Sequence, residues 1–222
     1  MSKPRAVVSW SSGKDSAFAL HVARLAGELE LVGLVTTVTT AFGRVAMHGV
    51  RDALLALQVD AIGLPCRTVA IPSPCPNEVY ERELFGALAA ARDAGVTHVV
   101  FGDLFLADIR AYREALLGKL GMTCAFPLWH RDTSELAREM IAAGLRANLT
   151  CVDPRQLDAS FAGRSFDAAL LAALPATVDP CGERGEFHTF VSAGPMFLAP
   201  IRVVPGEVVE RDGFVFADLL PA

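Results

Sequence analysis

The chain has 222 residues, of which 52% are hydrophobic and 20% are charged, so its composition is that of a packed globular protein. The formal net charge of −5 excludes a general electrostatic attraction to nucleic acid or to an acidic membrane. No apolar run approaches the ~20 residues of a membrane span, and the first residues do not resemble a secretory signal. The five cysteines form no CxxC pair, so we expect a cytoplasmic protein with free thiols and no zinc site.

The first half of the chain alternates segments that are typical of strands and of helices. We predict strands at residues 6–10, 31–37, 66–71, 98–101 and 123–126, and helices at residues 15–26, 48–57, 78–94 and 107–120. Asn77 is the expected N-cap of the third helix. This alternation indicates βαβ units with right-handed crossovers, and therefore a parallel sheet.

The second half is less regular. We predict helices at residues 133–143 and 163–174, and strands at residues 145–152, 201–204 and 214–217. The regular alternation of predicted strands and helices stops near Pro127, and we place a domain boundary there. We therefore expect an α/β chain in two parts: a parallel-sheet, Rossmann-like nucleotide-binding domain over residues 1–127 and a smaller α+β domain over residues 128–222.

A small polar loop joins the first predicted strand to the first predicted helix. A helix N-terminus carries unpaired backbone N–H groups and the positive end of the helix dipole, so it suits a phosphate group. Small residues let these amides approach an anion closely, and Lys14 adds a positive charge. Hydroxyl groups come from Ser11, Ser12 and Ser16. A serine-rich cap on an ordinary helix remains the alternative interpretation of these residues.

This loop is not the common P-loop of nucleotide-binding proteins. That motif has glycine and serine or threonine where Val8 and Asp15 stand here.

Polar residues also end two other predicted strands. Thr36 and Thr37 end the second strand, and Gly102 and Asp103 end the fourth. Because the carboxyl ends of parallel strands meet at one edge of a sheet, we expect these residues to lie beside the loop.

A second cluster of chemically active side chains occupies residues 182–189, Gly-Glu-Arg-Gly-Glu-Phe-His-Thr. Its two carboxylates, Glu183 and Glu186, lie three residues apart between glycines. Such a pair can hold Mg²⁺ or act as a general base. A hairpin turn with solvated charges is the alternative, and the residues alone leave both open.

Both motifs carry a family resemblance. Residues 11–16 resemble the SGGxDS pyrophosphate loop of the ATP pyrophosphatases, with Ser12 where the first glycine usually stands. Residues 182–189 are similar to the GE-x-GE-(F/Y)-x-T signature of the diphthine–ammonia ligase family. Residues 102–104 and 126–129 resemble its GD-(I/L) and (F/Y)PLW elements. These landmarks follow the family's order across almost the whole chain.

The resemblance implies a HUP-type ATP-binding domain and an ATP-dependent ligase. ATP would activate a carboxylate as an acyl-adenylate with release of pyrophosphate, and ammonia would displace AMP to leave an amide. The implied acceptor is diphthine, a modified histidine of elongation factor 2. The implied catalytic residues are Lys14, Glu183 and Glu186, and Mg²⁺ would be held by Asp15 and Asp103. The implied ATP-binding residues are Ser11, Ser12, Gly13, Lys14, Asp15, Ser16, Thr36, Thr37, Gly102 and Asp103.

Three other functions stay open. Diphthine exists only on archaeal and eukaryotic elongation factor 2, so a bacterial chain would act on another carboxylate, such as a corrinoid side chain. A non-catalytic module that binds adenine nucleotides is the second alternative, although it would not need Glu183 and Glu186. A sulfur-inserting tRNA enzyme is the third, and the missing CxxC pairs and basic stripe count against it.

The remaining expectations concern partners and secondary candidates. Free ammonia or a separate protein would supply the nitrogen, no membrane is involved, and a homodimer is a possible assembly. His48 and Arg51 are expected to open the second helix and to face the nucleotide edge, with an ordinary solvated helix start as the alternative. Arg110, Tyr112 and Arg113 follow Asp103 and would meet an anionic substrate, with a solvated helix face as the alternative.

Overall fold

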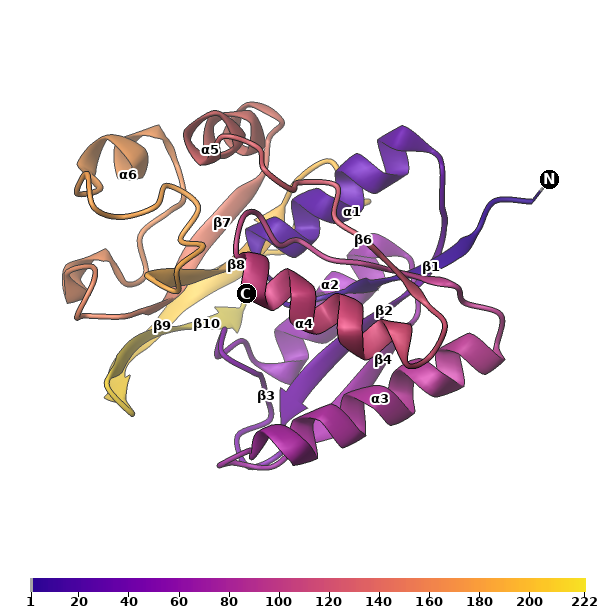
Figure 1. Ribbon diagram of the computed structural model, residues 1–222. Helices are drawn as coiled ribbons and strands as arrows, with labels where there is room; N and C mark the ends of the chain where they lie inside the picture. The colour runs from indigo at the N-terminus through magenta and orange to yellow at the C-terminus, as the bar shows by residue number, and fades with distance from the viewer. Residues whose placement is uncertain (1) are drawn as a thin grey trace.

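The computed structural model describes residues 2–222 and contains two sheets. The larger sheet has the strand order β3-β2-β1-β5-β6, and β4 pairs with β2 (Figure 1). Every strand pair in it is parallel except that of β2 with β3. Its strands are β1 (Arg5–Ser9), β2 (Glu30–Thr39), β3 (Arg44–Val45), β4 (Cys66–Ile71), β5 (His98–Val100) and β6 (Thr123–Ala125).

Helices cover both faces of this sheet, as Figure 1 shows. They are α1 (Lys14–Ala26), α2 (Asp52–Ile62), α3 (Asn77–Asp93) and α4 (Ala107–Gly118). Successive strand residues point to opposite faces, so Val8 packs in the core of α1 and α2 while Val7 packs in the core of α3 and α4. The sheet is apolar on both sides, which is why its strands read as near-continuous apolar runs.

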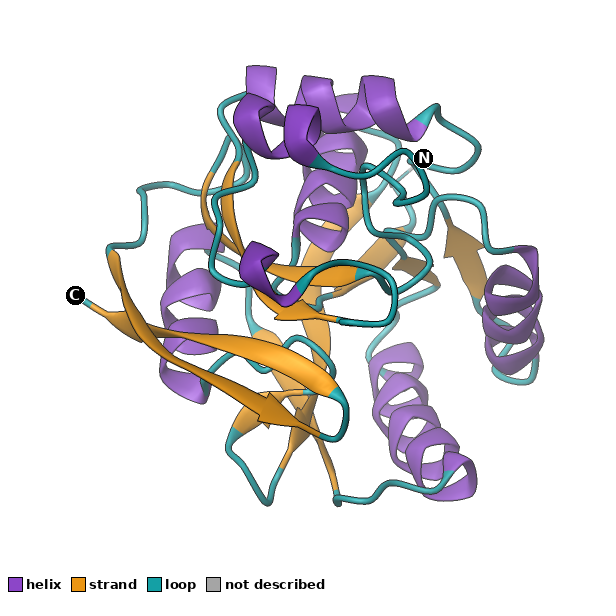
Figure 2. Cartoon of the chain, turned by 90° about the vertical axis from the view of Figure 1, so that its left-hand side faces the viewer, coloured by secondary structure: helices purple, strands orange, loops and turns teal. Residues whose placement is uncertain are grey.

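The second sheet is antiparallel, with the order β8-β7-β10-β9. Its strands are β7 (Arg146–Val152), β8 (Phe187–Ala193), β9 (Val203–Arg211) and β10 (Phe214–Pro221). Helices α5 (Thr133–Ala142) and α6 (Ala168–Ala173) and the short 3₁₀ helix Ala159–Phe161 accompany it. In Figure 2 the β9–β10 hairpin extends along one side of the molecule, with β9 as an edge strand.

The fold class is the one predicted: a mostly parallel α/β sheet joined to a smaller α+β part. The two parts share one hydrophobic core, in which Phe187 and Phe190 of the second sheet belong to the same cluster as Val8 and Phe18. The position of the boundary near Pro127 stays a prediction. Among residues 2–222, no helix combines the length and the apolar character that a bilayer span requires.

Several predicted elements differ from the structure. The helix expected at residues 48–57 begins only at Asp52, because Met47 and Gly49 have positive φ angles of 64° and 66° and form a turn. The helix expected at residues 163–174 is reduced to Ala168–Ala173, since Ser165 forms a β-bridge with Asn148.

Two smaller differences concern a cap and a hairpin. Asn77 is the first residue of α3 rather than its cap, and Pro76 takes the cap position without a side-chain hydrogen bond. The two short strands expected near the end of the chain are the longer hairpin strands β9 and β10.

Candidate active site

The loop between β1 and α1 is a tight turn with close packing on both sides. Ser12 has φ 69°, in the left-handed region, and its buried Oγ has no hydrogen-bond partner among the described residues. Gly13 precedes the first residue of α1 and lies against His48, because a Cβ at Gly13 would be 2.5 Å from His48 Cε1. A side chain at position 13 would therefore require the His48 ring to move.

The second motif caps α1. The backbone N–H of Lys14 donates to Thr189 Oγ1 at 3.0 Å, and the backbone N–H of Val191 donates to the Ser12 carbonyl at 3.0 Å. Gln58 of α2 is fully buried, and its Nε2 donates to the Ser12 and Val191 carbonyls at 3.1 and 2.7 Å. Strand β8 is thus fixed to the loop by main-chain and side-chain bonds.

The side chain of Lys14 is buried and engaged with the protein. Its ammonium donates to the Cys181 carbonyl and to Asp15 Oδ2, the latter at 2.8 Å, and lies 5.3 Å from the centre of the Phe187 ring. Burial opposes the charged form, but Asp15, Cys181 and Glu183 together outweigh it and raise the pKa of Lys14. The charged Lys14 therefore joins α1 to the loop that carries the second motif.

The loop after β5 packs directly on the start of α1. A Cβ at Gly102 would lie 2.6 Å from the Asp15 carbonyl carbon, so this approach requires glycine. The next residue, Asp103, has Oδ2 2.9 Å from Nε of Arg113, whose guanidinium lies 4.4 Å from the centre of the Phe101 ring. Asp103 is thereby balanced by a positive charge.

Glu183 reaches across to this same loop. Its Oε1 accepts hydrogen bonds from the backbone N–H groups of Leu104 at 2.8 Å and Phe105 at 3.4 Å. Burial raises the pKa of Glu183 to about 7, against the lowering effect of these hydrogen bonds. A carboxyl group with this pKa gains and loses its proton near neutral pH, as a general base requires.

Glu186, three residues on, has a different environment. Its Oε1 accepts from the Asp179 backbone N–H and its Oε2 from the Arg184 backbone N–H, both at 2.9 Å, and the residue is 1% exposed. Both carboxylate oxygens therefore hold the backbone of the loop in place.

Two imidazoles lie beside the N-terminus of α1. His48 and His188 have ring centres 4.7 Å apart, and His48 Nδ1 is 2.9 Å from the Thr189 carbonyl oxygen. Burial lowers the pKa of His48 to about 4 and that of His188 to about 3. Both rings are neutral at pH 7, and the bond to the carbonyl makes Nδ1 of His48 the protonated nitrogen.

These groups surround a pocket of about 220 Å³. One wall comes from β1, α1 and the loop after β5, and the other comes from residues 182–189. The amides of the α1 N-terminus suit a phosphate, and a titrating carboxyl lies opposite. The lining residues are Ser9, Ser11, Lys14, Asp15, Ser16, His48, Phe101, Gly102, Asp103, Arg113, Gly182, Glu183, Gly185, Phe187, His188 and Thr189.

Comparison with known proteins assigns both parts of the chain to one family. Residues 4–124 match the family model of the diphthamide synthase N-terminal domain, and residues 132–216 match that of the diphthamide synthase C-terminal domain. The chain belongs to the diphthamide synthase family.

Several relatives in this family carry the name diphthine–ammonia ligase. The Homo sapiens protein is 27% identical over 176 residues, which cover 72% of this chain and 66% of that protein. The Rattus norvegicus protein is 28% identical over the same shares. The Schizosaccharomyces pombe protein is 33% identical over 102 residues, 44% of this chain and 17% of that protein. The chain thus spans 66% or less of these relatives' lengths.

The structure brings most of the predicted site residues together. Seven of them line the pocket, and Ser12 and Gly13 form the turn beside it. The seven are Ser11, Lys14, Asp15, Ser16, Gly102, Asp103 and Glu183.

Three predicted residues lie elsewhere. Thr36 and Thr37 do not end their strand, because β2 continues to Thr39, and neither lines the pocket. Glu186 is also absent from the lining, since its carboxylate faces the backbone of its own loop.

Two further residues help to form the site. Gln58 looks like an ordinary polar residue of a helix, and no local pattern marks it as the link between the loop and β8. His48 does line the pocket, as expected, but from a turn rather than from a helix start, while Arg51 points to Asp218 instead.

The predicted Mg²⁺ ligands are a partial match for that ion. Among residues 2–222 no group of three or more histidine, cysteine, aspartate or glutamate side chains is arranged to hold a metal. Asp15 Oδ1 and Asp103 Oδ2 are both buried without a hydrogen-bond partner, and each carboxylate also has an ion pair, Asp15 with Lys14 and Asp103 with Arg113. Mg²⁺ is commonly bound by one or two carboxylates together with substrate phosphates, which one aspartate here would satisfy.

Proposed function

We propose that this protein is an ATP-dependent amide-forming ligase that releases AMP and pyrophosphate. The observation that carries the proposal is the convergence of the two motifs on one pocket. Thr189 caps the helix of the phosphate loop, and Glu183 holds the loop after β5, so the anion cradle and a titrating carboxyl face each other. The family membership and the names of the relatives support the same chemistry.

The reaction has two steps. In the first, a carboxylate oxygen of the acceptor attacks the α-phosphorus of ATP, and the bond to the β-phosphate oxygen breaks, which gives an acyl-adenylate and pyrophosphate. In the second, the nitrogen of ammonia attacks the acyl carbon, and the bond to AMP breaks. The amide forms, and the excess proton leaves the nitrogen.

Several polar groups that line the pocket have proposed roles in this reaction. The N–H groups at the start of α1 other than that of Lys14, which donates to Thr189, would stabilise the departing pyrophosphate together with Ser11 and Ser16. Deprotonated Glu183 would take a proton from ammonium or from the attacking nitrogen. Bound Mg²⁺ would neutralise phosphate charge, with Asp15 as its ligand from the protein. Lys14 would act by holding Asp15 and the loop at Cys181 in position.

The acceptor is proposed to be a carboxylate. The relatives' names point to diphthine, and a small-molecule carboxylate would use the same two steps. The alternative of a non-catalytic nucleotide-binding module leaves the titrating carboxyl of Glu183 without a role.

The test is product analysis of ATP turnover with ammonium chloride and separate acceptors, including elongation factor 2 that carries diphthine. Release of AMP and pyrophosphate that depends on both ammonium and one acceptor supports the ligase. Binding of ATP without AMP release for every acceptor would instead support the nucleotide-binding module.

A further inference from the structure

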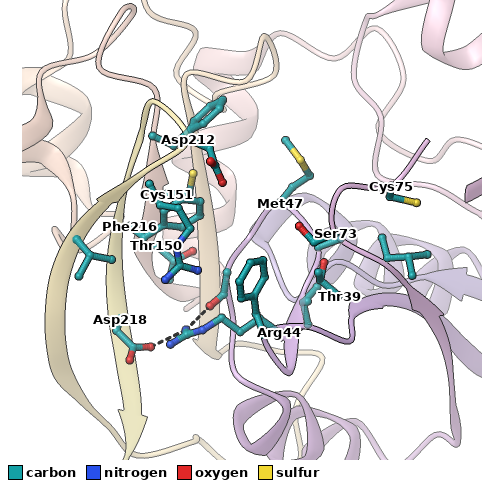
Figure 3. Close-up of a pocket in the computed structure, with 18 of the residues that line it drawn as sticks. Thr39, Arg44, Met47, Ser73, Cys75, Thr150, Cys151, Asp212, Phe216 and Asp218 are labelled. Atoms are coloured by element: carbon teal, nitrogen blue, oxygen red, sulfur yellow. Dashed lines mark hydrogen bonds and ion pairs between the residues drawn. The ribbon is translucent and has the colours of Figure 1, made fainter. Parts of the chain in front are cut away.

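A second cavity, of about 390 Å³, lies between the two parts of the chain. In Figure 3 one side carries Thr39, Arg44, Met47, Ser73 and Cys75 and the other carries Thr150, Cys151, Asp212, Phe216 and Asp218. Its size is within the range of about 300–1,000 Å³ that is typical of small-molecule sites.

Aromatic and aliphatic side chains supply much of the lining of this cavity, and two of its charged residues, Arg44 and Asp218, pair with each other. Phe214, Phe216 and Ile71 contribute to the lining. Arg44 is bound to Asp218 at 2.8 Å, and the guanidinium of Arg211 lies 4.8 Å from the centre of the Phe42 ring. The inner walls therefore offer mainly apolar contact, which suits an uncharged, ring-sized body of a ligand, while Asp212, exposed at the end of the hairpin, has no ion pair among residues 2–222.

The cavity lies next to the candidate nucleotide pocket, although no residue lines both. His48 lines the pocket, while its neighbours Met47 and Gly49 line the cavity. Cys151 lines the cavity and pairs in register with His188 of the pocket. Neither imidazole lines the cavity itself, but residues that do line it flank the pair, which lies next to the N-terminus of α1, where an anion is stabilised.

We propose that this cavity is the acceptor subsite, and that it takes a small carboxylic acid with an apolar, ring-bearing body. The body fills the space between β3 and the β9–β10 hairpin, and the carboxylate lies at the imidazole pair, next to the phosphates of ATP. This inference rests on the proposed ligase function and names the class of its substrate.

The first test is a binding experiment that needs no turnover. Saturation-transfer NMR with the full chain measures binding of 3-phenylpropionate, acetate and 3-phenylpropan-1-ol, with and without MgATP. We expect the phenyl acid to bind better than acetate, which lacks the body, and better than the alcohol, which lacks the carboxylate. We also expect the phenyl acid and MgATP to bind together.

Two neighbouring valines of β9 provide a matched pair of variants. Val209 lines the cavity and is 38% exposed, whereas Val208 is 60% exposed and does not line it. We expect Val209→Trp to weaken binding of 3-phenylpropionate about tenfold by filling the cavity, and Val208→Trp to leave it unchanged. Equal affinity in Val209→Trp and wild type would overturn the proposal, as would displacement of the acid by MgATP, which would assign the cavity to the nucleotide.

Turnover separates this inference from the proposed function. If Val209→Trp weakens binding of the phenyl acid but no acceptor, elongation factor 2 with diphthine included, supports AMP release in the wild type, the cavity is a ligand site and the ligase function fails. If Val209→Trp forms AMP with the true acceptor at the wild-type KM, the ligase stands and the acceptor subsite lies elsewhere.

Discussion

The backbone N–H of Lys14 donates to the hydroxyl of Thr189 at 3.0 Å, across 175 positions of the chain. Gly13, at the cap position of α1, has no side chain to accept this bond. A residue of the second sheet therefore completes the first turn of the helix that forms the phosphate site. This relationship and its neighbours lead to five predictions.

Replacing Thr189 tests the cap. In Thr189→Ala the buried N–H of Lys14 loses its acceptor, and we expect the free energy of unfolding to fall by about 1 kcal/mol. Thr189→Ser keeps the hydroxyl and is expected to retain most of the stability. Urea denaturation of the three proteins measures the difference, and equal loss in Ala and Ser variants would attribute it to the lost methyl group instead.

Glu183 is expected to set the pH dependence of the reaction. The base acts in its deprotonated form, so the rate rises with pH through the value of about 7 that burial gives its pKa. Glu183→Gln should lower kcat by about 100-fold or more, with little change in the KM for ATP, and should remove this limb of the profile. Glu207→Gln on exposed β9 is the control. A limb near pH 7 that persists in Glu183→Gln would exclude Glu183 as its source.

Glu186 is predicted to act on stability instead. A glutamine there places an amide N–H₂ against a backbone N–H that now donates to the carboxylate, so the buried donor is left unpaired. We expect Glu186→Gln to destabilise the protein by about 1–3 kcal/mol while the folded fraction keeps its kcat. Calorimetry combined with activity per folded molecule checks this. A stable but inactive variant would show that Glu186 takes part in the reaction.

Ser12 is expected to be a strained position. Its φ of 69° favours glycine, and its buried hydroxyl has no partner among the described residues. Ser12→Gly removes both penalties, which outweighs the added freedom of the unfolded chain, so we expect a gain of about 1 kcal/mol. The neighbouring Ser11→Gly, whose hydroxyl bonds Ser16 at 3.0 Å, should destabilise. A loss of stability in both variants would contradict the strain argument.

Asp218 links the two parts of the chain through Arg44 and Arg51. Burial opposes its charge, but hydrogen bonds from the two guanidinium groups outweigh it and lower the pKa of Asp218 to about 2. Because the folded-state pKa is below the unfolded value, this stabilisation is present above about pH 4 and is lost as pH falls toward 2.

The matching variant is Asp218→Asn. Since the side chain of Arg51 is 42% exposed, we expect a modest loss of about 1 kcal/mol at pH 7. The loss should shrink as the pH of the unfolding experiment approaches 2. Asp212→Asn, on the exposed end of the hairpin, should have no effect at either pH, and a constant difference for Asp218→Asn would show that its charge is not the cause.

Local patterns predicted the parallel sheet well, because its strands are apolar runs bounded by turn residues. The strand at residues 66–71 was predicted with the bounds it has, and the carboxyl-edge argument correctly placed Gly102 and Asp103 beside the phosphate loop. Both depend only on sequence that is close to the residues concerned.

The sequence was least informative where contacts between distant parts of the chain determine the local structure. Thr36 and Thr37 looked like the end of a strand, but pairing with β3 and β4 extends β2 to Thr39. Glu183 and Glu186 look equivalent in the motif, and only the backbone groups that each meets distinguish them. Gln58 carries no signal in the sequence because both of its acceptors come from other elements.

The long separation of Lys14 and Thr189 has a consequence for synthesis on the ribosome. When α1 and its serine-rich loop have emerged from the ribosome, the hydroxyl of Thr189, which completes the first turn of that helix, has not yet been synthesised. The loop also lacks its main-chain bond from Val191 to Ser12 until β8 has emerged. We therefore expect the chain to bind ATP only late in its synthesis, because the phosphate loop lacks its partner strand during most of translation.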